Sequence, residues 1–82
     1  DYIVDSLAWV QYRHGRYEEA WESINKCIEL GGDEATIWEH YGDIAFVLGK
    51  FDQAAKGYSE AIQRKPDNVD EVQKKLAAAQ KK

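Results

Sequence analysis

The segment GRYEEAWESINKCI (residues 15–28) returns 34 residues later as GKFDQAAKGYSEAI (residues 49–62). The glycine, the aromatic residue and the first alanine occupy the same places in both segments. The same offset extends beyond them without a gap, in the pairs Ala8 and Gly42, Tyr12 and Phe46, and Asp33 and Asp67. Because size or character is kept at each matched position, the chain is predicted to contain two copies of one structural unit.

Apolar residues within each unit lie three or four positions apart, which is the spacing of one face of an α-helix. Gly15 and Gly49 stand where the first helix of each unit should end, since glycine adopts the left-handed backbone of a helix terminus at no steric cost. The fold is therefore predicted to be all-α. About five helices are expected, near residues 2–14, 18–30, 34–48, 52–65 and 69–82.

These residues resemble the tetratricopeptide repeat family. In the first unit the resemblance rests on Leu7-Ala8, Gly15-x-Tyr17-x-x-Ala20 and Ile24-x-x-Cys27. In the second unit it rests on Trp38-x-x-Tyr41-Gly42, Gly49-x-Phe51-x-x-Ala54, Tyr58-x-x-Ala61 and Pro66. The first unit departs from the family pattern at Val4, Gln11 and Gly32. The resemblance implies a right-handed α-solenoid with repeats at residues 1–34 and 35–68 and a C-terminal capping helix at 69–82.

Small residues are expected where the two helices of a unit cross, at Ala8 with Ala20 and at Gly42 with Ala54, because close helix packing needs short side chains. For Gly57 the sequence leaves two explanations open, a close neighbour or a neutral position on the outer face.

In the last helix, Asn68 and Glu71 have the spacing of a capping box. Lys74, Lys75, Lys81 and Lys82 are expected to face water. Lys75 aligns with Leu7 and Tyr41, so a polar residue there predicts that no further repeat stacks on this helix and that its replacement by alanine is almost neutral.

The composition excludes several classes of function. The net charge of −4 disfavours a general nucleic-acid binder, and no apolar run approaches the roughly 20 residues of a membrane-spanning helix. The single cysteine, Cys27, excludes an internal disulfide, and its alignment with Ala61 indicates a small buried packing residue. Since the chain has no methionine, it is expected to be part of a longer protein. Its compartment stays open, cytoplasmic or, for an exported parent, the bacterial envelope.

No residue pattern predicts catalysis. Glu18, Glu19 and Glu22 suit the first turns of a helix, where the helix dipole favours negative charge. His14 and His40 lie on different helices with no metal-ligand spacing around them. The chain is therefore predicted to be no enzyme and to have no metal site and no cofactor.

The resemblance implies that first helices of successive units line a concave groove that holds partners. The groove positions of the first unit are Asp5, Trp9 and Tyr12, flanked by Tyr2, and those of the second unit are Glu39, Asp43 and Phe46. Carboxylates among aromatic rings favour a basic protein or peptide segment with an apolar anchor, because flat rings and negative charge both attract Lys and Arg. The same acids disfavour the family branch that grips the terminal carboxylate of chaperone tails.

Four alternatives to a groove-binding module remain. The chain could be the structural C-terminal end of a longer solenoid, or an accessory region of an enzyme whose catalytic part lies upstream. Tyr12 and Phe46 could be partly core, with Trp9 packed on an upstream repeat. The aromatic N-terminal face could also form a homodimer.

Overall fold

The computed structural model describes the backbone of residues 2–81 and the side chains of residues 7–81. It contains five helices and, over the described backbone, no strand, as predicted. The helices are α1 (Tyr2–Arg13), α2 (Tyr17–Glu29), α3 (Ala35–Val47), α4 (Phe51–Gln63) and α5 (Val69–Gln80). Both ends of α4 lie 34 residues after those of α2, and α5 begins 34 residues after α3, so the period seen in the sequence is also the period of the helices.

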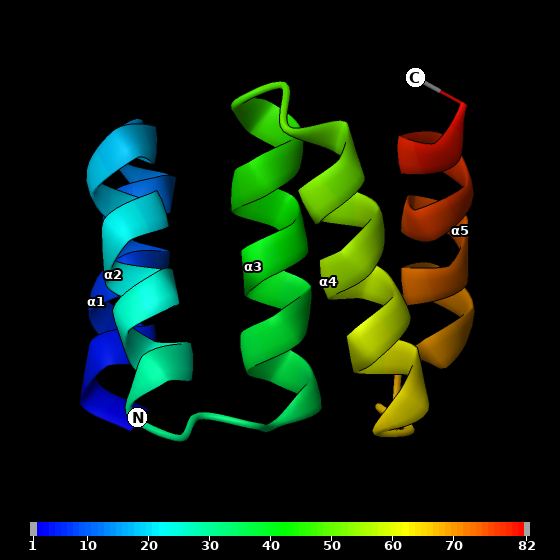
Figure 1. Cartoon of the computed structure of the whole chain (residues 1–82), viewed down its shortest axis with the longest axis horizontal. Helices are drawn as coiled ribbons and strands as arrows, with labels where there is room; N and C mark the ends of the chain where they lie inside the picture. The colour runs from blue at the N-terminus through cyan, green and yellow to red at the C-terminus, as the bar shows by residue number, and fades with distance from the viewer. Residues whose placement is uncertain (1, 82) are drawn as a thin grey trace.

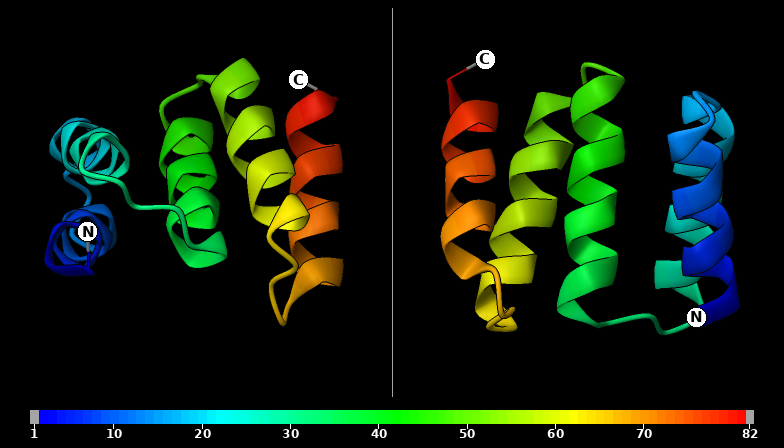
Figure 2. Two further views of the ribbon diagram at one scale, coloured as in Figure 1. Left: turned by 60° about the horizontal axis from the view of Figure 1, so that its bottom comes forward. Right: turned by 180° about the vertical axis from the view of Figure 1, so that it is seen from behind.

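The helices form antiparallel hairpins that follow one another in chain order. Figure 1 shows the α1–α2 hairpin at one end, the α3–α4 hairpin in the middle and α5 at the other end. The two further views keep this order, with α5 alongside α4 (Figure 2). The helix α5 therefore occupies the place of the first helix of a third unit.

In the turn inside each hairpin, a single residue bonds back to the first helix through its amide and forward to the second helix through its carbonyl. Gly15 and Gly49 have φ angles of +80° and +78°, in the left-handed region that the sequence predicted. The amide of Arg16 then donates to the Gln11 carbonyl at 2.8 Å, and the Arg16 carbonyl accepts from the Ala20 amide at 2.9 Å. Lys50 makes the equivalent pair of bonds, and neither Arg16 nor Lys50 makes a side-chain capping hydrogen bond.

The small residues predicted for the helix crossings are buried. Ala8, Ala20 and Ala54 are fully buried, and Gly42 is buried beneath the Tyr58 ring. Gly57 is also buried, and a Cβ atom placed there would lie 2.7 Å from Tyr41 Cδ1 and 2.8 Å from the Gly42 backbone nitrogen. The question that the sequence left open about Gly57 is therefore answered by a close neighbour.

Ring packing and an ion pair are among the contacts that join the first hairpin to the second. Trp21 of α2 packs against Tyr41 of α3, with 4.8 Å between the ring centroids. Arg64, at the end of α4, donates from Nε to the Asp33 carbonyl at 2.7 Å and also pairs with the Asp33 carboxylate. The hydrogen bond from Arg64 lowers the pKa of Asp33, and it ties the loop between α2 and α3 to the second hairpin.

The predicted capping box at the start of α5 is wrong. Asn68 precedes the helix, but its side chain makes no capping hydrogen bond. Its amide nitrogen instead lies 3.2 Å from both carboxylate oxygens of Glu39 on α3. The Asn68 side chain therefore acts as a donor to a charged acceptor on α3, and its oxygen accepts no capping bond at the start of α5.

Candidate partner-binding surface

Three aromatic rings connect α1 to α3 on the predicted groove. Trp9 stacks on Tyr12 with 5.0 Å between ring centroids, and on His40 of α3 with 4.0 Å. Tyr12 also contacts Tyr17, at 5.7 Å. Stacking takes up part of the indole surface that we expected to be open for a partner's cation, so Trp9 offers less flat area than the sequence indicated.

The two acids of α3 are held by a lysine from α5. Lys75 Nζ lies 2.8 Å from Glu39 Oε2 and 3.2 Å from Asp43 Oδ1. Both carboxylate side chains are largely buried, with exposed fractions of 13% and 11%. Tyr58 of α4 donates its hydroxyl hydrogen to Asp43 Oδ1 at 2.7 Å, so the three helices α3, α4 and α5 meet in one polar network.

The expectation that Lys75 faces water is therefore wrong. Its side chain is only 30% exposed and points to acids that lie 32 and 36 positions earlier in the chain. Tyr41, which aligns with Lys75, is likewise largely buried, at 7% exposure. The polar character of Lys75 was misread as exposure, although here it reflects a charged partner on the neighbouring first helix.

The network changes the protonation equilibria of its members. Burial lowers the pKa of the Lys75 ammonium group, but the hydrogen bond to Glu39 and the charge of Asp43 outweigh burial and raise that pKa above its ordinary 10.5. Burial and the bond to Asp43 raise the pKa of Tyr58 far above its ordinary 10.0. The pKa of Tyr12 is raised by burial and by the charge of Asp43. Lys75 is therefore held charged and Tyr58 neutral at physiological pH.

A pocket of about 180 Å³ opens beside this network. Its lining residues come from α3, α4 and α5 and are Asp43, Phe46, Tyr58, Lys75 and Ala78. Phe46 also packs edge-on against Phe51, with 5.3 Å between centroids, so one part of the ring belongs to the core and another lines the pocket. The alternative that Tyr12 and Phe46 are partly core is confirmed by their packing on the buried cluster.

Of the seven predicted site residues, five can be placed. Glu39, Asp43 and Phe46 lie together on α3. Trp9 stacks on His40 of the same helix, and burial and the charge of Asp43 raise the pKa of Tyr12. The side chains of Tyr2 and Asp5 lie outside the described residues. Sequence reasoning missed Tyr58, Lys75 and Asn68. A basic or amide residue about one repeat length after Glu39 was the available signal, because first helices of consecutive units lie near each other.

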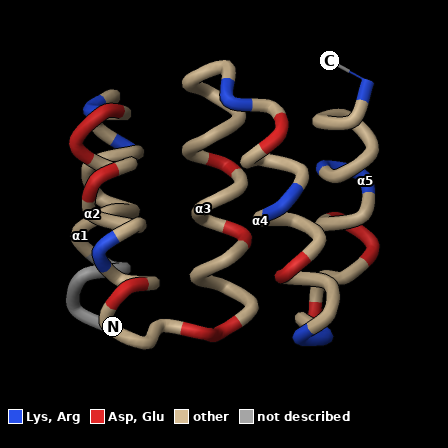
Figure 3. Tube along the Cα trace, in the orientation of Figure 1, with Lys and Arg blue, Asp and Glu red and all other residues tan. Residues whose placement is uncertain are grey.

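Charge is unevenly distributed along the chain. Residues 1–48 contain ten acidic and three basic residues, for a net charge of −7, and residues 49–82 contain five acidic and eight basic ones, for +3. Figure 3 shows acidic positions along α2 and α3 and basic positions on α4 and α5. Lys75 belongs to the basic half of the chain and lies beside Glu39 and Asp43. These three side chains together carry one net negative charge.

The described residues contain no group of three or more His, Cys, Asp or Glu side chains that could hold a metal ion. Cys27 is buried and forms no disulfide, in agreement with its predicted packing role. None of the helices over the described range has the length and apolar character needed to cross a membrane.

Stability is expected to fall at alkaline pH because of the buried tyrosines. Folding raises the pKa of Tyr58, Tyr41 and Tyr12 above 10.0, so the unfolded chain loses these protons first and is favoured as pH rises past about 10. The contribution of Lys75 is likewise complete below about pH 10.5 and lost as its raised pKa is passed. Urea unfolding at several pH values should show a plateau that ends near pH 10 and a shallower decline for Tyr58→Phe.

The control for this profile is Tyr17→Phe, which changes an exposed tyrosine. An identical alkaline decline in the parent and in Tyr58→Phe would contradict the role given to the Tyr58 hydroxyl.

Antiparallel helical hairpins repeated at a constant interval define the class of α-helical repeat proteins. Residues 35–68 match the family model of the tetratricopeptide repeat. The five helices of the chain are consistent with tetratricopeptide-like repeats. No curated protein and no solved structure gave a significant match to the chain. The tetratricopeptide repeat is in general a protein–protein interaction module and is typically non-catalytic.

Proposed function

We propose that the chain binds a partner protein or peptide on the surface formed by Trp9, Tyr12, Glu39, Asp43 and Phe46, with an apolar anchor of the partner in the pocket beside Phe46. The pocket between α3, α4 and α5 carries this proposal. Its volume of about 180 Å³ suits one aromatic or branched aliphatic side chain, since a cavity of about 150 Å³ can hold benzene.

The polar edge of the pocket supports a cationic group next to the anchor. Glu39 and Asp43 together carry two negative charges and Lys75 carries one positive charge, so one negative charge is uncompensated within the network. The aromatic rings of Trp9 and Tyr12 lie along the same surface and add contact area for the partner. A segment with one aromatic or aliphatic anchor and a nearby Lys or Arg fits both features.

Repeats at residues 1–34 and 35–68, with a capping helix at 69–82, are part of this proposal. The equal spacing of helix ends supports the division, and so does the match of the second segment to the family model. In this organisation α5 completes the binding surface as well as covering α4, because Lys75 and Ala78 line the pocket.

A peptide with a Lys or Arg beside an apolar anchor is expected to bind about tenfold more tightly than an acidic peptide of equal length at 0.1 M salt. The difference should shrink at 1 M salt, where the Debye length falls from about 10 Å to about 3 Å. Isothermal titration of both peptides at the two salt concentrations measures the effect. Phe46→Ala should weaken both peptides by removing a wall of the pocket.

Val47→Ala is the matched control, since Val47 follows Phe46 on α3 and is exposed. Tighter binding of the acidic peptide would contradict the charge preference, and unchanged binding by Phe46→Ala would contradict the pocket. Sedimentation of the free chain before the titration detects a homodimer. If changes on this surface leave every interaction of the longer protein intact, the chain is a structural segment instead.

A further inference from the structure

The carboxylates of Glu39 and Asp43 already accept donors from this chain. Lys75 Nζ lies 2.8 Å from Glu39 Oε2, and 3.2 and 3.3 Å from the two carboxylate oxygens of Asp43. The Asn68 amide lies 3.2 Å from both oxygens of Glu39, and the Tyr58 hydroxyl donates to Asp43 Oδ1 at 2.7 Å. Each of the four oxygens has a partner, and the two side chains are only 13% and 11% exposed. A cation from another molecule must therefore replace one of these donors to reach the carboxylates at contact distance.

Lys75 is the donor that can be replaced without unpacking a helix. Its ammonium group stands at the end of a flexible four-carbon stem, its side chain is 30% exposed, and it lines the pocket of about 180 Å³. Tyr58 also lines this pocket, but it is 2% exposed and its ring packs on Gly42. Val72 is fully buried and Ala79 is 3% exposed, so α5 stays packed when the ammonium group of Lys75 turns towards water.

We propose that Lys75 is an internal competitor of the partner: its ammonium group occupies the place of an arginine of the partner, which binds by displacing Lys75 from Glu39 and Asp43. This inference rests on the proposed function, because it concerns the same surface. Only molecules in which Lys75 is detached accept the arginine, so the intrinsic affinity is reduced by the fraction of such molecules. Lys75 therefore sets how strongly a basic partner binds.

The arrangement favours arginine over lysine as the incoming residue. A partner lysine would only repeat the contacts of Lys75, whereas the planar guanidinium group has five donors and can form two parallel bonds to a carboxylate. Asp43 bonds to Lys75 and also lines the pocket, so the arginine lies next to the apolar anchor. Side chains two positions apart in an extended segment point to the same side. A segment with an aromatic anchor and an arginine two positions later therefore suits the site.

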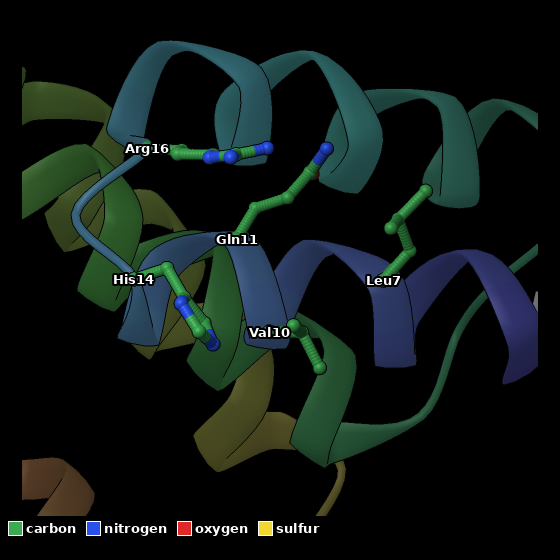
Figure 4. A pocket seen from close by; sticks show the side chains of 5 residues that line it. All are labelled: Leu7, Val10, Gln11, His14 and Arg16. Carbon is green, nitrogen blue, oxygen red and sulfur yellow. The ribbon is translucent and has the colours of Figure 1, made fainter.

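A hollow on the first hairpin is unsuited to the same segment. It has a volume of about 230 Å³ and is lined by Leu7, Val10, Gln11, His14 and Arg16 (Figure 4). None of these lining residues is acidic, and the charge of Arg16 repels a cation. A segment that contains arginine is therefore expected at the pocket between α3, α4 and α5 and not on α1.

Two synthetic peptides that differ at one position test the exchange. Both have a phenylalanine anchor, and two positions later one has arginine and the other glutamine. In calorimetric titrations, Lys75→Met is expected to bind the arginine peptide about fivefold to tenfold more tightly than the parent chain does, and the glutamine peptide with less than about a twofold change. Lys74→Met is the matched control, because it removes the same charge from the adjacent exposed lysine, and it should change both affinities less than about twofold.

A second measurement uses the parent chain and does not depend on the folding of Lys75→Met. The ammonium hydrogens of Lys75 are expected to exchange slowly with water while they are bonded to two carboxylates. NMR of the chain labelled at its lysine side chains should show them exchanging as fast as those of Lys74 in the complex with the arginine peptide. They should stay slow with the glutamine peptide. A third peptide, with lysine in place of arginine, should bind the parent about threefold more weakly than the arginine peptide.

Failure of this inference differs from failure of the proposed function. An unchanged affinity of Lys75→Met for the arginine peptide, or an equal gain for both peptides, would overturn the competition, even where Phe46→Ala still weakens both peptides. Slow exchange of the Lys75 hydrogens in the arginine complex would mean that the arginine binds beside Lys75 and not in its place. Equal affinities for the arginine and lysine peptides would overturn the choice of arginine. If Phe46→Ala weakens neither peptide, the pocket is not used and the proposed function itself is wrong.

Discussion

Gly57→Ala is expected to lower the free energy of unfolding by about 2 kcal/mol, although alanine is the better helix former by about 1 kcal/mol. The added methyl group would lie 2.8 Å from the Gly42 backbone nitrogen and 2.9 Å from the Trp38 carbonyl oxygen. Backbone atoms cannot rotate away as a side chain does, so α3 and α4 must separate. For a domain of this size the thermal midpoint should fall by on the order of 10 °C.

Lys56→Ala on the same helix is the control for Gly57→Ala. Lys56 is exposed and its replacement should change the free energy of unfolding by less than about 0.5 kcal/mol. Urea unfolding followed by circular dichroism compares the two variants. A Gly57→Ala variant that is more stable than the parent would show that helix propensity outweighs the crossing and that the two helices can move apart freely.

The second large effect is expected for Lys75→Met, which should cost about 2 kcal/mol of unfolding free energy. Methionine keeps much of the stem that packs on α3 but leaves Glu39 and Asp43 without their shared cation. Two largely buried carboxylates then repel each other, and the Asn68 amide and the Tyr58 hydroxyl that bond to them carry no charge. The estimate is below the full cost of breaking a buried ion pair because Lys75 is 30% exposed.

The control for Lys75→Met is Lys74→Met, since Lys74 is the adjacent lysine and is exposed. The specific test is a double-mutant cycle with Glu39→Gln and Asp43→Asn. In that neutral background the cost of Lys75→Met should fall well below its cost in the parent chain. An equal cost in both backgrounds would mean that Lys75 acts through its alkyl stem and not through its charge.

The sequence was sufficient for the helices because the signals that define them are local. Gly15 and Gly49 marked two helix ends, and Ala20 and Ala54 marked two crossings, through size and backbone freedom alone. Comparison of the two units then showed which positions were structural. The helix bounds expected from these signals differ from the observed ones by no more than two residues.

The candidate site was harder to predict because its geometry depends on which helices become neighbours. From the sequence, Glu39 and Asp43 were expected to be free acids, but Lys75 of α5 lies 2.8 Å from Glu39. The ring of Trp9 was expected to be open to a partner, but His40 of α3 stacks on it. The Asn68 side chain could cap its own helix or bond to a residue far away in the sequence, and its distance of 3.2 Å to Glu39 shows the second. In each case the missing information was the identity of the group across an interface.

The packing of each helix mainly on its sequence neighbours has a consequence for how the chain folds. Contacts of short sequence separation require little loop-closure entropy, and helical proteins of this kind fold on the order of microseconds to milliseconds. The α3–α4 hairpin, where Gly42 and Gly57 allow a close approach, is expected to be the nucleus. The α1–α2 hairpin is attached through a smaller interface between α2 and α3, so we expect it to join last and to be released first. Folding is therefore expected to run outward from the middle of the chain.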